Sequence, residues 1–227
     1  YFSQLEALYG DEIFLSFNNH REKIANDLTK NDDQNRLSIY KDKIKNCLKC
    51  ELGNSRKNFV FGSGDPNASL LIIGEAPGEH EDLSGEPFVG RAGKLLDKML
   101  LAINMSRKND VFICNVLKCR PPDNRNPKKE EIDECEPYLI NQIDLIQPKL
   151  IVALGRIAGK TLLGVEKSLK EMRGVLHKYH SRSLIVTYHP AALLRNPNWK
   201  HGAWEATMVG QAGAGRKLPT WPSRVTK

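Results

Sequence analysis

The stretch Leu70-Leu-Ile-Ile-Gly-Glu-Ala-Pro-Gly78 decides the fold. Its first four residues are all apolar and include β-branched side chains, which is typical of a strand buried on both faces of a parallel sheet. The glycines and the proline that follow predict a tight turn, which brings backbone amides close to a ligand. A buried strand that runs directly into such a turn is typical of an α/β domain, in which ligands bind at the strand ends. Such turns also close many βα connections, so this turn alone is weak evidence for a site.

Three further apolar runs of strand length follow, at 111–116, 150–154 and 184–188. Helix-like segments separate the first three runs, at about 91–104 and 128–146, and another follows the third run at 156–164. Val175-Leu176 is a candidate for an additional short strand. Strands that alternate with helices predict a three-layer αβα fold, in which helices cover both faces of a short, mainly parallel sheet of four strands.

The chain has 227 residues, of which 40% are hydrophobic, so it can form one α/β domain with a packed core. We divide it into a helical N-terminal extension (1–40), a main domain (41–202) and a C-terminal segment (203–227). The extension contains a polar linker at 29–35. The C-terminal segment is rich in glycine and proline, and we expect it to be disordered or foreign to the natural domain.

Composition also narrows the class of partner. No apolar run is long enough to span a bilayer, and no signal peptide opens the chain, so we expect a cytoplasmic protein with no membrane partner. The formal net charge of +7 suits a polyanion such as nucleic acid. Residues 203–227 contribute +3 of this charge. The excess on the rest of the chain is therefore mild and supports nucleic-acid binding only weakly.

The five cysteines form an uneven pattern. Cys47 and Cys50 form a C-x-x-C pair, whereas Cys114, Cys119 and Cys135 lie far downstream. An odd number of cysteines in a chain without an export signal argues against a disulfide framework and indicates a metal or cluster site. The spacing alone fits either tetrahedral zinc or an iron–sulfur cluster, since both accept four thiolates.

Unusual residues follow each predicted strand. The second strand runs into Lys118-Cys-Arg-Pro-Pro122, the third into Gly155-Arg156 and the fourth into His189-Pro-Ala-Ala192. Because the carboxyl ends of parallel strands meet at one edge of a sheet, these residues predict a site there. A glycine-rich loop also presents Phe88 just before a helix. Such an aromatic residue is either a core side chain or a platform on which a base stacks.

Four sequence blocks together resemble the family 4 uracil-DNA glycosylases, in the order and at the spacing of that family, over about residues 40–200. The blocks are Gly74-Glu-Ala-Pro-Gly-Glu-His-Glu-Asp82, Pro87-Phe-Val-Gly-Arg-Ala-Gly93, Asn115-Val-Leu-Lys-Cys-Arg-Pro-Pro122 with Asn124, Arg125 and Pro127, and His189-Pro-Ala-Ala-Leu-Leu-Arg195. The resemblance implies the uracil-DNA glycosylase fold and a monofunctional DNA-repair enzyme. Such an enzyme flips uracil out of single- or double-stranded DNA and hydrolyses its N-glycosidic bond, which releases free uracil and leaves an abasic site. We expect a monomer.

In that family, four cysteines spaced in this way hold a 4Fe–4S cluster. The resemblance therefore assigns the cluster to Cys47, Cys50, Cys119 and Cys135. We interpret the cluster as structural, since it would join the first cysteine segment to the loop between Cys119 and Cys135. Cys114 lies inside a predicted strand, and we interpret it as a small buried apolar residue.

The resemblance also assigns the residues that read the base. The ring would stack on Phe88, and Asn115 would form paired hydrogen bonds with uracil N3–H and O4, a pattern that cytosine reverses. The backbone of the turn from Gly74 through Glu75 to Ala76 would meet the edge that carries O2. His189 would donate a hydrogen bond to O2, where negative charge grows as the bond breaks.

The carboxylate that orients the attacking water is less clearly assigned. The best-known glycosylase class has an aspartate at the position of Ala76, so the acid must lie elsewhere in this chain. Glu81 is our first candidate and Glu75 our second, and the alternative for either is an acid that caps the loop. A relative that traps its DNA covalently carries an Arg-Arg-Ile-His insertion. Residues 120–127 contain no histidine, so we expect turnover by water.

Several residues are candidates for DNA contacts. Leu193, Leu194 and Arg195 follow the histidine and could enter the gap left by the flipped base. Basic residues near the strand ends could contact phosphates, although a solvated basic face is the alternative for each. These are Arg91, Lys118, Arg120, Arg125 and Arg156.

Two other functions remain open at this point. The first is a damage-binding or accessory DNA module with the same fold and little or no turnover, which the missing acid at Ala76 permits. The second is an iron–sulfur electron carrier or radical enzyme. The sequence has neither a C-x-x-x-C-x-x-C run nor a second cysteine cluster, which argues against this second alternative.

Overall fold

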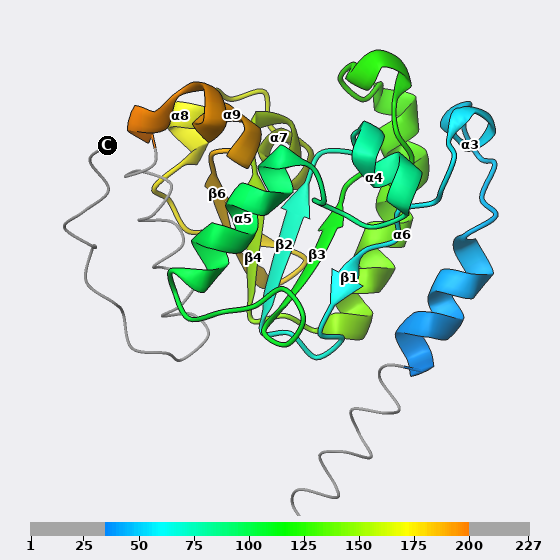
Figure 1. The fold of residues 1–227 in the computed structure, drawn as a ribbon, viewed down its shortest axis with the longest axis horizontal. Helices are drawn as coiled ribbons and strands as arrows, with labels where there is room; N and C mark the ends of the chain where they lie inside the picture. The colour runs from blue at the N-terminus through cyan, green and yellow to red at the C-terminus, as the bar shows by residue number, and fades with distance from the viewer. Residues whose placement is uncertain (1–34, 200–227) are drawn as a thin grey trace, which may run out of the picture.

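Four parallel strands form the centre of the sheet, as the sequence predicts. They are β2 (Leu70–Gly74), β3 (Val111–Asn115), β4 (Leu150–Leu154) and β6 (Arg182–Thr187). The computed structural model describes residues 35–199, so the predictions for 1–34 and for the C-terminal segment lie outside the described residues. Within that range the α/β fold and the mainly parallel sheet are confirmed (Figure 1).

Two short antiparallel strands extend the sheet from four strands to six, in the order β1-β3-β2-β4-β6-β5. The strand β1 (Ser63–Gly64) pairs with β3, and β5 (His177–Tyr179) pairs with β6. The additional strand that the sequence predicts at Val175-Leu176 is displaced, because those two side chains are exposed and the strand begins at His177. Edge strands this short pair through their backbones, so hydrophobic periodicity does not reveal them.

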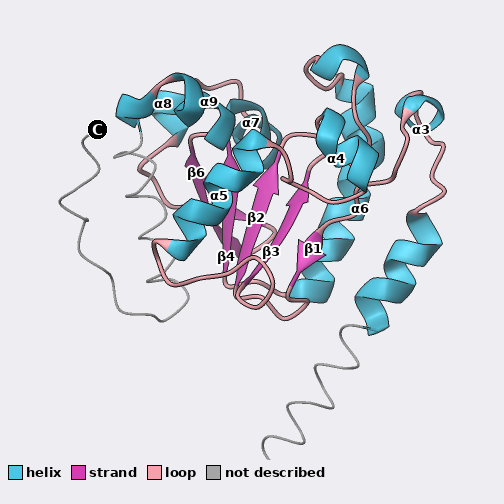
Figure 2. Ribbon diagram, viewed as in Figure 1, coloured by secondary structure: helices cyan, strands magenta, loops and turns pink. Residues whose placement is uncertain are grey.

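Helices cover both faces of the sheet, because successive side chains of a buried strand point to opposite sides. On one face, Leu70 and Ile72 of β2 belong to the same core cluster as Leu96 and Leu100 of α5 (Arg91–Leu101). On the other face, residues at the alternate positions of β2 pack with α6 (Lys129–Ile146) and α7 (Arg156–Leu163). Figure 2 shows the resulting three layers.

A helix at 35–44 precedes the cysteines and crosses the boundary that we expected between 40 and 41. Its Leu37 and Ile44 are buried in the core cluster on the α6 side of the sheet. A one-turn helix, α3 (Leu52–Ser55), follows the C-x-x-C pair. This part of the chain therefore packs against the domain and holds the first two cysteines beside it.

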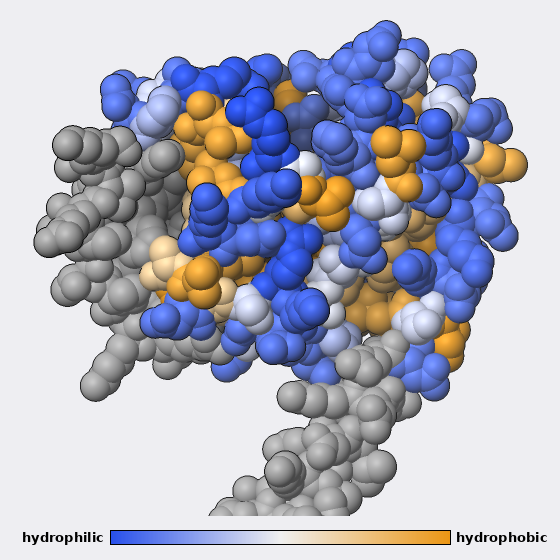
Figure 3. Space-filling view, viewed as in Figure 1, coloured by the Kyte–Doolittle hydropathy of each residue, from blue (hydrophilic) through white to orange (hydrophobic). Residues whose placement is uncertain are grey.

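The carboxyl ends of the parallel strands meet at one edge, and short elements follow them there (Figure 1). These are α4 (Glu79–Ser84) after β2, η1 (Pro122–Asn124) after β3 and α9 (Pro190–Arg195) after β6. The remaining elements are α8 (Leu169–Met172) and η2 (Pro197–Trp199). None of the helices within 35–199 combines the length and the apolar character that a membrane crossing requires. Figure 3 shows a largely hydrophilic face with scattered hydrophobic patches.

Candidate active site

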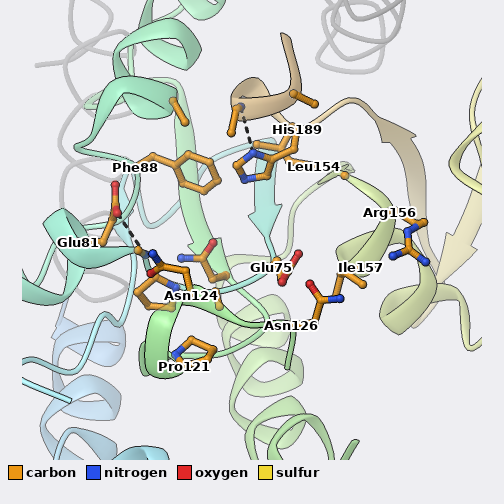
Figure 4. A pocket seen from close by; sticks show the side chains of 18 of the residues that line it. Glu75, Glu81, Phe88, Pro121, Asn124, Asn126, Leu154, Arg156, Ile157 and His189 are labelled. Atoms are coloured by element: carbon orange, nitrogen blue, oxygen red, sulfur yellow. Dashed lines mark hydrogen bonds between the residues drawn. The ribbon is translucent and has the colours of Figure 1, made fainter. Parts of the chain in front are cut away.

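A pocket of about 610 Å³ opens at this edge of the sheet. Its volume lies in the range of pockets that bind small molecules. Six of the residues that the sequence assigned to the base or to the chemistry line it, although they come from four different segments of the chain. They are Glu75, Ala76, Glu81, Phe88, Asn115 and His189. Figure 4 shows the Phe88 and His189 rings side by side, with Glu75 between them and Asn126.

The Phe88 ring is held in the pocket by a constrained loop. Phe88 has a φ of 54°, which is uncommon for a residue with a side chain. A Cβ atom on Gly93 would lie 1.7 Å from the Phe88 carbonyl oxygen, so only glycine allows the loop to pass there. Arg107 donates to the carbonyls of Pro87 at 3.0 Å and Phe88 at 2.7 Å. Phe88 is both a core residue and a wall of the pocket, so the two interpretations of this aromatic residue are not exclusive.

Asn115 ends β3 with its side chain in the pocket. The residue is 1% exposed, and its Oδ1 is buried without a hydrogen-bond partner among the described residues. A Cβ atom on Gly74 would lie 2.3 Å from this oxygen and 2.6 Å from the Phe88 ring, so the glycine lets the turn pass both groups. A buried polar atom without a partner is costly and rare. The pocket therefore presents an acceptor that a ligand N–H can satisfy.

His189 precedes α9 and is held by the first turn of that helix. Its Nδ1 accepts a hydrogen bond from the Ala191 amide at 3.1 Å, which leaves the proton of the neutral ring on Nε2. Burial lowers the pKa of His189 to about 4, with a further lowering from Arg195 that Glu81 opposes. The imidazole is therefore neutral at physiological pH and offers one N–H donor. Its ring centre lies 5.5 Å from that of Phe88.

The two candidate carboxylates differ in what they contact. Glu81 accepts hydrogen bonds from the amides of Val89 and Gly90, both at 2.9 Å, and from the amide of Gly78 at 3.1 Å. It therefore ties the start of α4 to the Phe88 loop. Glu75 is half-buried, and burial raises the pKa of its carboxyl, an effect that Arg156 partly offsets. Within the described residues, no hydrogen bond or ion pair is found at the Glu75 carboxylate.

The cysteine cavity lies beside this site and is bordered by Cys47, Cys50, Cys119 and Cys135. None of the five cysteines forms a disulfide, and Cys114 is fully buried in the core instead. Three donors reach the cavity sulfurs. The Arg56 guanidinium donates to Cys119 at 3.3 Å, the Tyr138 hydroxyl to Cys47 at 3.2 Å and the Lys118 amide to Cys135 at 3.3 Å.

The cysteine cavity offers the thiol ligands that an iron–sulfur cluster takes. Among residues 35–199, no group of three or more His, Cys, Asp and Glu side chains is close enough to hold one metal ion. A cluster spreads its ligands over several atoms and takes thiolates, with hydrogen bonds to the sulfurs. Four cysteines around one apolar cavity, with donors aimed at three of the sulfurs, meet that description.

The residues predicted to contact DNA differ in their exposure to solvent. Arg91, Arg156, Leu194 and Arg195 are exposed, whereas Arg120 is half-exposed and lies 4.0 Å from Glu79. Arg125 is half-exposed and engaged with Glu131 through both of its terminal nitrogens.

Two of those predictions are wrong. Lys118 is 0% exposed, and its ammonium donates to the Asn115 carbonyl at 2.7 Å, so it cannot contact a phosphate. Leu193 is 1% exposed because it lies on the inward face of α9, one turn after His189. Neighbouring positions on a helix point in different directions, which is why Leu194 is exposed instead.

Other residues of the site were not predictable from the sequence alone or carried only a weak signal. Asn124 and Asn126 line the pocket, and Arg120 donates to the Asn124 side chain at 2.9 Å. Asn124 belongs to the third of the four sequence blocks that resemble the glycosylases, and this could have identified it as a site residue. Arg107 supports Phe88 from a segment that gave no signal at all, because the carbonyls that it holds in the Phe88 loop belong to the main chain, which any sequence provides. Its other partner is the Asp97 carboxylate, at 2.7 Å.

Comparisons with known proteins agree with this geometry. The model of the uracil DNA glycosylase superfamily matches residues 61–209. The chain is 48% identical over 170 residues to a type-4 uracil-DNA glycosylase of Sulfurisphaera tokodaii, covering 71% of this chain and 77% of that protein. It is 41% identical over 187 residues to a type-4 uracil-DNA glycosylase of Archaeoglobus fulgidus, covering 78% and 92%. A type-5 uracil-DNA glycosylase of Thermus thermophilus is 34% identical over 152 residues, covering 57% and 68%.

Proposed function

This chain belongs to the uracil-DNA glycosylase superfamily, and we propose that it removes uracil from DNA by hydrolysing the N-glycosidic bond. The products are free uracil and an abasic site. The observation that carries this proposal is the buried, unpaired Oδ1 of Asn115, which lies in the same pocket as the Phe88 and His189 rings. A flat base with an N–H donor on its edge is the kind of ligand that such a pocket satisfies.

Base selection follows from the Asn115 amide. Its Oδ1 would accept from uracil N3–H and its amide nitrogen would donate to O4, whereas cytosine presents the reverse pattern of donor and acceptor at these two positions. A site built around such a pair rejects a base that leaves buried groups unpaired. The ring would stack on Phe88, and the turn at Gly74–Ala76 would contact the edge that carries O2. The close approach of Gly74 to both side chains supports this arrangement.

His189 would stabilise the leaving group. As the bond breaks, negative charge grows on the uracil ring, and a donor fixed in advance lowers the energy of that state. The Nδ1 of His189 is already occupied by the Ala191 amide, so its Nε2–H is the donor available to O2. A neutral imidazole with a low pKa remains a donor throughout the physiological pH range.

We further propose that Glu75, rather than our first candidate Glu81, orients the water that attacks the sugar. Three backbone amides already occupy the Glu81 carboxylate, which supports a role in holding the Phe88 loop. Glu75 lines the pocket with no such engagement among the described residues, and the raised pKa of its carboxyl favours proton uptake from water.

The exposed and half-exposed residues on this side of the molecule are candidates for DNA binding. Extruding a base costs a few kcal/mol, which contacts with the phosphates and with the gap must offset. Leu194 and Arg195 remain candidates for the gap, and Arg91, Arg120, Arg125 and Arg156 for the phosphates. We propose that the protein acts as a monomer inside the cell, where uracil arises in genomic DNA.

We propose that Cys47, Cys50, Cys119 and Cys135 hold a 4Fe–4S cluster. The similarity to type-4 uracil-DNA glycosylases and the four cysteines around one cavity support this assignment. The cluster would supply a crosslink between the segment at 47–50 and the segment at 119–135. No step of the hydrolysis described above requires an electron from it.

The test is incubation of the purified protein with an oligonucleotide that carries one uracil, followed by alkali to cleave abasic sites. We expect strand cleavage at the uracil, and none in matched oligonucleotides with thymine or cytosine at that position. Tight binding of the uracil strand without cleavage would contradict hydrolysis and favour the accessory DNA module.

A further inference from the structure

Lys118 carries a fully buried ammonium group between the cysteine cavity and the base pocket. It is 0% exposed, and its Nζ donates to the main-chain carbonyl of Asn115 at 2.7 Å. No carboxylate within residues 35–199 forms an ion pair with it. A buried cation is costly unless it is compensated, and an apolar side chain of the same length would avoid that cost. The lysine therefore needs an explanation other than packing.

The segment that contains Lys118 is tied to both sites. On the side of the base pocket, the Val116 amide donates to the Gly74 carbonyl at 2.9 Å, and the Leu117 amide donates to the Glu75 carbonyl at 3.0 Å. On the other side, the Lys118 amide donates to Cys135 Sγ at 3.3 Å. Three consecutive residues thus connect the turn that would contact uracil to the cysteine cavity.

Packing reinforces this connection. Leu117, Cys119 and Cys135 form one buried cluster, and Ala76 of the base pocket packs against it. The Lys118 carbonyl is also held, because it accepts from the Val60 amide at 2.8 Å. A displacement of the cysteines would therefore be transmitted to the end of β3, which carries Asn115.

We propose that Lys118 is a positioning residue, which fixes the Asn115 end of β3 and couples the cysteine cavity to uracil recognition. This inference rests on the proposed function. The ammonium clamps the carbonyl of the residue whose side chain selects the base, while the adjacent amide binds a cavity sulfur.

A double-mutant cycle separates positioning from general structural support. Lys118→Met removes the ammonium but keeps an apolar chain of similar length, so we expect iron content and thermal stability close to wild type. The single-turnover rate on a uracil oligonucleotide should fall at least about tenfold, because small displacements of positioning groups are costly. In an Asn115→Ala background, the same change should have little further effect.

Gln142→Leu is the matched control. Gln142 is also fully buried and donates to a main-chain carbonyl, that of Phe61 at 2.9 Å, but it does not line the base pocket. We expect this variant to excise uracil at the wild-type rate. Lys118→Gln, which keeps a neutral donor, should fall between wild type and Lys118→Met and provides a second variant if the methionine protein does not fold.

Linkage gives a readout that does not depend on activity. If the two sites are coupled, free uracil at saturating concentration should slow the release of iron from the wild-type protein to a chelator. This protection should be reduced in Lys118→Met and retained in Gln142→Leu.

Absence of protection in the wild type would overturn the coupling. The positioning role would be overturned if Lys118→Met excised uracil at the wild-type rate. It would also be overturned if Lys118→Met reduced the rate by the same factor in the Asn115→Ala background as in the wild type. Failure of the wild type to cleave uracil DNA would instead refute the proposed function.

Discussion

Replacing His189 with alanine should slow bond cleavage far more than it weakens binding of uracil DNA. The side chain supplies one donor, Nε2–H, since Nδ1 is engaged by the Ala191 amide at 3.1 Å. That donor binds uracil O2, where negative charge develops only as the bond breaks. Its loss therefore raises the activation barrier, but it weakens the binding of intact uracil DNA much less. Removal of one such donor typically costs roughly 10²–10³-fold in rate.

The pH dependence gives the same variant a second signature. The pKa of His189 is lowered from 6.5 to about 4, so the ring loses its proton well below neutral pH. We therefore expect the ratio of wild-type to His189→Ala rates to be constant between pH 5 and 8. The lowered pKa also means that the unfolded chain binds more protons than the folded one between pH 6.5 and 4. The stability that His189 contributes in the neutral form is therefore lost as pH falls through that window, up to about 3 kcal/mol at about 1.4 kcal/mol per pKa unit.

The assay is a single-turnover measurement with enzyme in excess over a single-stranded uracil oligonucleotide, with affinity measured separately. His177→Ala is a suitable control, because His177 lies on β5 and contacts the Met172 carbonyl instead of the base pocket. A His189→Ala rate within a few-fold of wild type, or a loss confined to affinity, would refute the assigned role.

Three further experiments test other parts of the site. Glu75→Gln should reduce the single-turnover rate by roughly 10²-fold or more, and Glu81→Gln should reduce it less; the reverse order would restore Glu81 as the water-orienting acid. Gly74→Ala should abolish detectable excision in a protein that still folds, because the added methyl would lie 2.3 Å from the Asn115 amide oxygen, and a wild-type rate would contradict the packing described. Cys119→Ser should lower iron content and thermal stability together, whereas Cys114→Ser should leave iron content unchanged; equal iron loss in both would contradict the ligand assignment.

Hydrophobic pattern predicts the centre of this fold because the four parallel strands are buried on both faces. Each leaves a continuous apolar run, and the helices between them have the expected length. The two edge strands leave no such trace, since Ser63–Gly64 and His177–Tyr179 pair through the backbone and face solvent in part.

The sequence predicts which residues gather in the pocket, but it does not predict which partners their side chains bind. The turn after β2, Phe88, Asn115 and His189 follow strand ends, and topology brings such positions together. The direction in which a side chain points cannot be predicted in this way. Lysine is usually exposed, so the sequence predicts that Lys118 contacts DNA, whereas the structure buries it. Its partner is a main-chain carbonyl, which no residue type reveals. The occupied Glu81 carboxylate was hidden from the sequence for the same reason.

The central claim is that the Asn115 amide reads the base, and Asn115→Asp tests it most directly. The substitution keeps the size of the side chain, but it removes the N–H donor to O4 and places a carboxylate beside a ring that becomes negatively charged. The measurement is the single-turnover rate on a uracil oligonucleotide beside the wild-type protein. We predict a loss of roughly 10²-fold or more. Excision at the wild-type rate would contradict the account.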